Sequence, residues 1–281
     1  MKNYYLSLTV MLSIAAVTFS NELVAGTFDT GIPLTWNCVG TCGTSGADGV
    51  VTIAPPGLST AYGWVSTLNG VTGEVLPGIT GPSSGGGAGI GSTNGSTLTS
   101  SLFSANAGDA LQFYFNYVTS DGATFADYAW AKLLDSSNNQ VAMLFTARTT
   151  DIAGGNSAPG FGMPANSATL TPAIVSIIDG GPSWSPLGGS SGLCYSLGCG
   201  YTGWIASDYA IKAAGNYMLQ FGVANWDDTA FDSGLAFDGL TVGGSPIEDN
   251  NVPEPNSLAL LGLGIAVFSF IRRFKVSVSV S

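Results

Sequence analysis

Short runs of β-branched and aromatic residues constrain the fold of this chain most strongly. Each run has the length of one strand, and turn residues such as Gly, Pro, Ser, Asn and Asp separate it from the next. Between the two ends of the chain, no convincing helical period of ten or more residues is found. The sequence therefore predicts an all-β fold built as an antiparallel β-sandwich. The expected strands are Gly49–Ala54, Ala110–Thr119, Asp127–Leu134, Gln140–Ala147, Trp204–Ile211, Asn216–Asn225 and Leu235–Val242.

One of these runs shows the alternation expected of a sheet with one buried face. Leu111 and every second residue as far as Tyr117 are apolar or aromatic, whereas Gln112 and Asn116 belong to the opposite, more polar face. The segment Asp135–Asn139 lies between two runs and is rich in turn residues, so we expect a hairpin loop there.

Two stretches interrupt the predicted strands. The first extends from Gly81 through Gly91 to Ser96, and its Gly and Ser content predicts a flexible loop. It lacks the Lys and the following helix of a phosphate-binding loop, so it indicates no nucleotide site. The second, Thr150–Gly203, contains a cysteine pair and four aromatic residues, and we interpret it as an ordered binding loop.

The charge of the chain excludes one class of partner. The whole chain has a formal net charge of −11 at pH 7. Between Gly26 and Pro255 the basic residues are Lys132, Arg148 and Lys212, against seventeen Asp and Glu residues. Such a segment repels the phosphate backbone and has no basic patch that could release counterions. We therefore expect no nucleic-acid partner.

The chain contains no histidine, which removes most catalytic and metal chemistry at neutral pH. Ser-His-Asp and Cys-His nucleophiles are excluded, and so are histidine-ligated metals. A glycosidase would need two carboxyl groups flanking one bond. The glutamates between residues 26 and 248 are Glu74 and Glu248, both near Gly/Pro- or Asn-rich loops, and no aspartate pair has a catalytic context. We predict that the protein is not an enzyme.

The N-terminal segment reads as a secretory signal peptide. Lys2 precedes an uncharged stretch from Tyr4 to Ser20, and small residues follow near Ala25. Cleavage after Ala25 satisfies the requirement for small residues, although an earlier cut is also compatible with the sequence. Export follows from this assignment, and the oxidising compartment beyond the membrane favours disulfide bonds.

The C-terminal segment has three ordered parts. A Pro-Glu-Pro motif at Pro253, Glu254 and Pro255 is followed by an apolar run from Ser257 to Ile271 and by the basic cluster 272–275. A helix of that length rises about 22 Å, less than the about 30 Å of a bilayer hydrocarbon core. The basic cluster would remain cytoplasmic while everything before it is exported.

This tail resembles the PEP-CTERM sorting signal of Gram-negative, exopolysaccharide-producing bacteria, with Pro253, Glu254, Pro255, Arg272 and Arg273 as the motif residues. The resemblance implies export through the Sec translocon, transient insertion in the inner membrane, and recognition and cleavage by an exosortase. The final location would be the cell envelope, the outer surface or the extracellular matrix. The tail departs from the pattern in six residues after the basic cluster. The alternative is an ordinary C-terminal anchor with a proline-rich stalk.

The predicted domains are a signal peptide at 1–25, a β-sandwich at 26–248 and a sorting segment at 249–281. Within the sandwich, Gly26–Gly31 with Trp36, and Asn225–Leu240, are similar to the first and last strands of jelly-roll domains common in PEP-CTERM cargo. Those domains in turn resemble galactose-binding-like and carbohydrate-binding modules. The resemblance implies a jelly roll whose first and last strands lie side by side.

Carboxylates near these two segments suggest a structural Ca²⁺, because Ca²⁺ takes six to eight oxygen ligands from flexible loops. With the first and last strands adjacent, Asp29 and Asp238 could share one ion. A second, local cluster consists of Asp227, Asp228 and Asp232. The alternative is that these residues cap backbone amides in turns and keep the surface soluble.

The four cysteines form two close pairs in the sequence. We expect the disulfides Cys38–Cys42 and Cys194–Cys199, because each closes a Gly-containing loop without a distant segment. Such small loops constrain little chain, so each bond should fix local geometry more than global stability. A four-sulfur zinc site is the alternative, although the spacings are wider than the usual knuckle.

Aromatic residues in or beside loops suggest that the exported domain binds glycan. The candidates for stacking on sugar rings are Trp184, Tyr195, Tyr201, Trp204 and Trp226. Burial in the core is the competing interpretation for each, and it is favoured for Trp130. We expect a non-enzymatic role in binding glycan or exopolysaccharide. The alternatives are an extracellular polysaccharide hydrolase and a structural matrix protein that binds other proteins.

Overall fold

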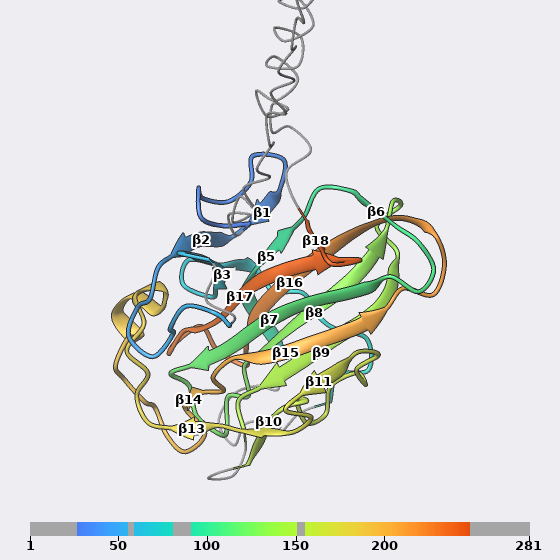
Figure 1. Cartoon of the computed structure of the whole chain (residues 1–281). Coiled ribbons are helices and arrows are strands. Elements are labelled where there is room, and N and C mark those ends of the chain that lie inside the picture. The colour runs from blue at the N-terminus through green and yellow to red at the C-terminus, as the bar shows by residue number, and fades with distance from the viewer. Residues whose placement is uncertain (1–26, 56–58, 81–90, 151–154, 248–281) are drawn as a thin grey trace, which may run out of the picture.

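The computed structural model describes residues 27–55, 59–80, 91–150 and 155–247 (Figure 1). The predicted signal peptide at 1–25 and sorting segment at 249–281, with Pro253, Glu254, Pro255, Arg272 and Arg273, lie outside the described residues. No helix in the described ranges is long and apolar enough to cross a membrane.

Two antiparallel sheets form the body of the protein. Sheet 1 has the strand order β1 (Asn37–Val39), β5 (Ser92–Thr99), β16 (Gly215–Trp226), β8 (Tyr128–Asp135) and β9 (Gln140–Arg148), with β4 (Val71–Thr72) and β6 (Phe103–Ala105) paired at its side. Sheet 2 has the order β11 (Thr169–Thr171), β15 (Ile205–Ala210), β7 (Ala110–Thr119), β17 (Ser233–Val242), β3 (Tyr62–Ser66) and β2 (Thr41–Ser45). Shorter strands β13 (Ile178–Asp179), β14 (Gly200–Tyr201) and β18 (Ser245–Pro246) extend sheet 2, while β10 (Asn156–Ala158) pairs with β12 (Val175–Ser176).

The order of the long strands is that of a jelly roll. Along the chain these strands are β3, β5, β7, β8, β9, β15, β16 and β17, yet they sort into β3-β17-β7-β15 in sheet 2 and β5-β16-β8-β9 in sheet 1. The connections therefore cross repeatedly from one sheet to the other, as two Greek keys require. The predicted all-β, antiparallel sandwich is confirmed.

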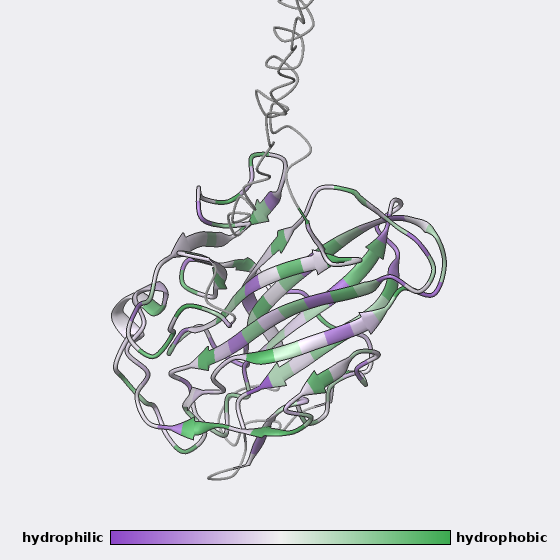
Figure 2. Cartoon of the chain, in the orientation of Figure 1, coloured by the Kyte–Doolittle hydropathy of each residue, from purple (hydrophilic) through white to green (hydrophobic). Residues whose placement is uncertain are grey.

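Alternating side chains fill the space between the sheets. Leu111, Phe113, Phe115 and Tyr117 of β7 are all buried, as the sequence pattern predicts. Two pairs of rings stack across the core: Phe115 lies 3.6 Å from Phe145, and Phe221 lies 3.9 Å from Phe237, measured between ring centroids. Figure 2 shows hydrophobic and hydrophilic bands alternating along the strands.

The outer face of each sheet is partly covered by loops, which form two smaller cores. On sheet 2, Val51 and the 3₁₀ helix η1 (Ser185–Ser190) pack over β3 and β17. On sheet 1, Leu76 packs over Tyr128 and Trp130, and Trp130 is fully buried as expected. Large aromatic residues that face outward are thus mostly withdrawn from solvent.

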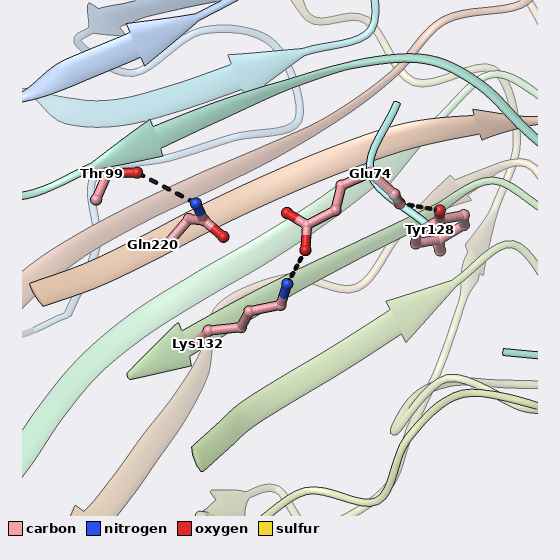
Figure 3. A network of polar contacts seen from close by, with 5 residues as sticks. All are labelled: Glu74, Thr99, Tyr128, Lys132 and Gln220. Carbon is pink, nitrogen blue, oxygen red and sulfur yellow. Dashed lines mark hydrogen bonds and ion pairs between the residues drawn. The ribbon is translucent and has the colours of Figure 1, made fainter. Parts of the chain in front are cut away.

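The polar contacts in Figure 3 fasten one of these covering segments to sheet 1. Lys132 forms an ion pair with Glu74, and the Tyr128 hydroxyl donates a hydrogen bond to the Glu74 carbonyl. Beside them, the Gln220 amide donates to the Thr99 hydroxyl at 3.3 Å. Lys132 of sheet 1 is therefore paired with a carboxylate of the covering segment.

Three predicted elements differ in the structure. Gly49–Ala54 is not a strand: it forms a single bridge between Asp48 and Val51, and it packs over sheet 2 instead of extending it. Residues 27–32 are turns and bends, although Phe28 packs 5.4 Å from Phe237 of β17. The predicted flexible loop ends earlier than expected, because β5 begins at Ser92.

Candidate functional site

Three loops meet at one end of the sandwich, which we call the loop end. They are the β7–β8 loop (Ser120–Asp127), the β16–β17 loop (Asp227–Asp232) and the loop closed by Cys194 and Cys199. The Tyr195 amide donates to the Ser120 carbonyl at 2.9 Å, and the Ala123 amide donates to the Leu197 carbonyl at 2.7 Å. The disulfide loop is therefore fixed directly over the β7–β8 loop.

Both predicted disulfides are formed, and the four-sulfur zinc site is excluded because no cysteine is left free. The Cα atoms are 6.1 Å apart in Cys38–Cys42 and 5.6 Å apart in Cys194–Cys199. Cys199 is buried next to β14, whereas Cys194 is exposed. The second disulfide thus anchors an exposed loop to the buried edge of sheet 2.

The exposed side of the disulfide loop carries an aromatic surface, which we call the Tyr195 platform. Tyr195 is 48% exposed, and Leu193 and Leu197 beside it are exposed as well. Two half-buried rings bracket Tyr195, with centroids 5.4 Å away for Phe125 and 5.1 Å away for Phe231. One ring comes from each of the other two loops, so all three loops contribute to the platform.

The other aromatic residues predicted to contact glycan are less accessible. Trp184 is fully buried, and its indole N–H donates to the Tyr62 hydroxyl at 2.9 Å, so the prediction of glycan contact is wrong for this residue. Trp204 is half-buried and donates to the Thr52 carbonyl at 3.0 Å. Tyr201 and Trp226 are half-buried. Burial of Trp184 stabilises the fold and removes that ring from the surface, whereas the other three rings keep part of their surface accessible.

In the predicted acidic cluster, Asp227, Asp228 and Asp232 each accept hydrogen bonds from different groups. Asp232 accepts hydrogen bonds from the hydroxyls of Thr67 and Ser190, both at 3.1 Å. Asp227 accepts from the Gly91 amide at 2.8 Å, and Asp228 accepts from the Ala230 amide at 3.0 Å. Among the described residues no three His, Cys, Asp or Glu side chains are grouped so that they could hold a metal ion. The local cluster is therefore a set of turn and loop contacts.

Two further carboxylates lie beneath the disulfide loop, and no pattern in the sequence distinguishes them. Asp121 and Asp127 are both 0% exposed. Asp127 accepts hydrogen bonds from the Trp226 amide at 2.8 Å and from the Ser233 hydroxyl at 2.6 Å. Asp121 accepts one from the Gly122 amide at 2.6 Å through Oδ1, whereas its Oδ2 has no hydrogen-bond partner.

Burial raises the pKa of both groups. Desolvation is the main cause of the raised pKa of Asp121, about 8, and the charge of Asp228 adds to it. Burial and the neighbouring charge of Asp121 raise the pKa of Asp127 well above its usual range. The two carboxyl groups therefore lie near enough to resist simultaneous ionisation.

Asp29 lies near enough to Asp238 for its charge to act on it, although Asp29 lies in a turn and not in the first strand that the jelly-roll resemblance implies. Asp29 Oδ1 accepts hydrogen bonds from the Ser59 hydroxyl and from two following amides at 2.7–3.0 Å. Asp238 of β17 is 1% exposed, and its Oδ1 has no hydrogen-bond partner. Burial raises the pKa of Asp238 to about 6, and the charge of Asp29 contributes. The orphaned oxygen and the raised pKa fit a site that would accept a cation.

Comparison with known proteins assigns the tail. The PEP-CTERM protein-sorting motif matches residues 251–273. The tail is a PEP-CTERM sorting signal. It indicates an exported protein that an exosortase processes after transient membrane anchoring. The match covers the end of the chain and does not extend into the sandwich.

The sandwich itself has weak similarities. A solved structure, the enzymatically active domain of bacteriophage CBA120 tailspike protein 4, is similar at 12% sequence identity with a TM-score of 0.31. The similarity covers 74% of this chain and 20% of the tailspike chain. No curated protein matches the chain.

Proposed function

We propose that this protein is a non-enzymatic glycan-binding component of the cell envelope or exopolysaccharide matrix, and that the Tyr195 platform is its binding surface. The observation that carries the proposal is a half-exposed tyrosine ring bracketed by Phe125 and Phe231 on a loop closed by a disulfide. The PEP-CTERM signal supports the location, because a sorted, exported protein meets surface polysaccharide.

The rigidity of the platform supports this role. The disulfide loop is hydrogen-bonded to the β7–β8 loop at both Tyr195 and Leu197. A ring held in one orientation loses little conformational entropy on binding, so more of the contact energy is retained as affinity. The exposed Leu193 and Leu197 extend the surface by an apolar margin. The same margin favours a second candidate, a matrix protein that binds other proteins through this patch.

The environment of the carboxylates supports a non-enzymatic role over polysaccharide hydrolysis. A retaining or inverting glycosidase needs two carboxyl groups that reach the scissile bond from both sides. Asp121 and Asp127 are two interacting carboxyl groups, but both are fully buried, and Asp127 is hydrogen-bonded to other protein groups. A polysaccharide chain on the Tyr195 platform would not touch either carboxyl group.

We also propose that Asp29 and Asp238 hold a structural Ca²⁺. The support is the buried Asp238 Oδ1 without a partner and the second carboxylate beside it. The ion would join the N-terminal turn to β17, where Phe28 already packs on Phe237. Chelation with EGTA should then lower the melting temperature of the wild type, and Asp238→Asn should remove that dependence on Ca²⁺ at this site.

A glycan array tests the proposed binding function. The wild type, Tyr195→Ala and the control Leu34→Ala, which changes an exposed apolar residue in another part of the chain, are compared with and without EGTA. We expect binding by the wild type and the control, and loss of at least tenfold in signal for Tyr195→Ala. Absence of any glycan signal would refute the proposal. New reducing ends on exopolysaccharide would support a hydrolase, and self-association without glycan binding would support the protein-binding alternative.

A further inference from the structure

We propose that Asp121 and Asp127 form an interior Ca²⁺ site beneath the disulfide loop, separate from the site proposed at Asp29 and Asp238. Asp121 is the second residue of the β7–β8 loop and Asp127 is its last, and the disulfide loop lies over Asp121, with Ser196 against Gly122. The proposal does not depend on what the Tyr195 platform binds.

Unpartnered buried oxygens are the first argument. Asp121 is 0% exposed, and its Oδ2 has no hydrogen-bond partner. Asn225 is also 0% exposed, and its Oδ1 is unpartnered while its amide donates to Asn94 at 3.1 Å. Asn225 follows Ala224, which pairs with Tyr128, and it precedes Trp226, whose amide donates to Asp127. Leaving buried acceptors without a donor or a cation is unfavourable.

The distribution of positive charge is the second argument. Three basic residues lie in the part of the chain that the structure describes: Lys132, Arg148 and Lys212. Lys132 pairs with Glu74, and Lys212 lies 5.5 Å from the ring of Tyr209. No ion pair to Asp121 or Asp127 is recorded among the described residues.

Arg148 is the basic residue that reaches this region, because its charge acts on Asp127 and its Nη2 has no hydrogen-bond partner. It donates hydrogen bonds to the carbonyls of Ala126, Thr80 and Phe161, and it lies 4.7 Å from the ring of Trp226. The printed hydrogen bonds of the guanidinium go to backbone carbonyls, so among the described residues Arg148 forms no direct ion pair with Asp121 or Asp127.

The chemistry of the surrounding donors selects the ion. Besides the Trp226 amide, the groups that contact the Asp127 carboxylate or its hydrogen-bonded neighbours are hydroxyls, with Ser233, Thr119 and Thr149 in one connected network. Sulfur and imidazole are absent from this network. An all-oxygen set with two carboxylates suits a hard cation with adaptable geometry, which is Ca²⁺. The proposed ligands include only two acidic side chains, and the described residues contain no group of three His, Cys, Asp or Glu side chains that could hold a metal ion.

A bound ion here would link the two strand ends that support the platform. Asp127 precedes β8 and is hydrogen-bonded to Trp226 of β16 and Ser233 of β17, so it already joins both sheets. Asp121 lies under the loop that carries Tyr195. Binding of Ca²⁺ would thereby hold the β7–β8 loop against both sheets and keep Tyr195 in place.

Calcium binding by variants tests this site. The purified full chain is stripped with EGTA, and its Ca²⁺ stoichiometry and affinity are measured by equilibrium dialysis for the wild type, Asp121→Asn, Asp127→Asn and Asp238→Asn. Asn keeps the size of Asp and removes its charge. We expect Asp121→Asn and Asp127→Asn each to lose one Ca²⁺ per chain, or to bind it at least tenfold more weakly. Both variants should keep Ca²⁺ at the separate site of Asp29 and Asp238, which Asp238→Asn removes.

Unchanged Ca²⁺ stoichiometry and affinity in folded Asp121→Asn and Asp127→Asn would overturn the proposal. Absence of Ca²⁺ binding by the wild type at about 1 mM Ca²⁺, the weak end of the range for extracellular calcium modules, would also overturn it. Circular dichroism confirms folding of each variant. Since Asp121→Asn keeps the acceptor for the Gly122 amide, a folded variant is expected. Mg²⁺ serves as the selectivity control, and equal binding of Mg²⁺ and Ca²⁺ at this site would contradict the assignment of Ca²⁺.

Discussion

The replacement Asp121→Asn should make the metal-free protein less sensitive to rising pH. Burial raises the pKa of Asp121 to about 8 from the usual 3.8. Between these two values the folded protein binds a proton that the unfolded chain has released. The stability contributed by the neutral carboxyl group is therefore complete below about pH 4 and is lost as the pH rises toward 8. Asparagine does not titrate, so the variant avoids this loss.

The size of the effect follows from the gap in pKa. At 1.36 kcal/mol per unit, the gap between 3.8 and pH 7 corresponds to a penalty of about 4 kcal/mol at most. Between pH 4.5 and pH 7 the contribution of Asp121 alone should be about 3 kcal/mol. The raised pKa values of Asp228, Asp232 and Asp238 act in the same direction and remain in both proteins. The pKa of Asp127 is raised in part by the charge of Asp121, so the difference between the two proteins reports Asp121 together with its effect on Asp127.

Urea denaturation followed by tryptophan fluorescence, in EGTA at pH 4.5 and pH 7, measures this difference. The wild type should lose about 3 kcal/mol more than Asp121→Asn over that interval. The control Asp179→Asn removes an exposed carboxylate and should keep the pH dependence of the wild type. Parallel pH profiles for the wild type and Asp121→Asn would refute the reasoning that burial governs this carboxyl group.

Three further replacements test other parts of the structure by the free energy of unfolding. Trp184→Phe should cost about 2–4 kcal/mol, because it leaves a cavity and removes the donor to the buried Tyr62 hydroxyl. The pair Cys194→Ser and Cys199→Ser should cost about 2 kcal/mol, the loop entropy for a separation of five residues, and a loss well above that would show a wider role for this disulfide. Gly222→Ala should cost about 1–3 kcal/mol, since the new Cβ would overlap the Trp130 ring, and a neutral result would contradict the packing of Trp130 over β16.

Strands with strong alternation could be predicted from the sequence, and those with glycine or hydroxyl residues could not. The run Ala110–Thr119 matches β7 at both ends, because its apolar side chains face the core between the sheets. β3 contains Gly63, where a Cβ would lie 2.7 Å from the rings of Phe28 and Phe237. β5 is almost entirely Ser, Thr, Asn and Gly. At Gly63 of β3 and Gly95 of β5, close approach of large rings or neighbouring backbone requires glycine, so neither strand shows a regular hydrophobic alternation.

The candidate site was predictable only where the contacts are local. The disulfides close short loops, so the sequence separation alone favours their pairing. Burial of Trp184 depends on Tyr62, which is 122 positions away, and no local pattern reveals that contact. Asp121 reads as a turn residue in Ser-Asp-Gly. Its burial arises from the disulfide loop above it, so its importance becomes visible only in the folded protein.

Co-sedimentation with exopolysaccharide from the producing cells tests the central claim most directly. Equal amounts of folded wild type and Tyr195→Ala are mixed with the isolated polymer in 1 mM Ca²⁺, within the roughly millimolar range of extracellular calcium sites. The account predicts that the wild type sediments with the polymer and that Tyr195→Ala stays in the supernatant, with at least tenfold less retained. Equal retention of both proteins, or retention of neither, would contradict a glycan-binding role for the Tyr195 platform.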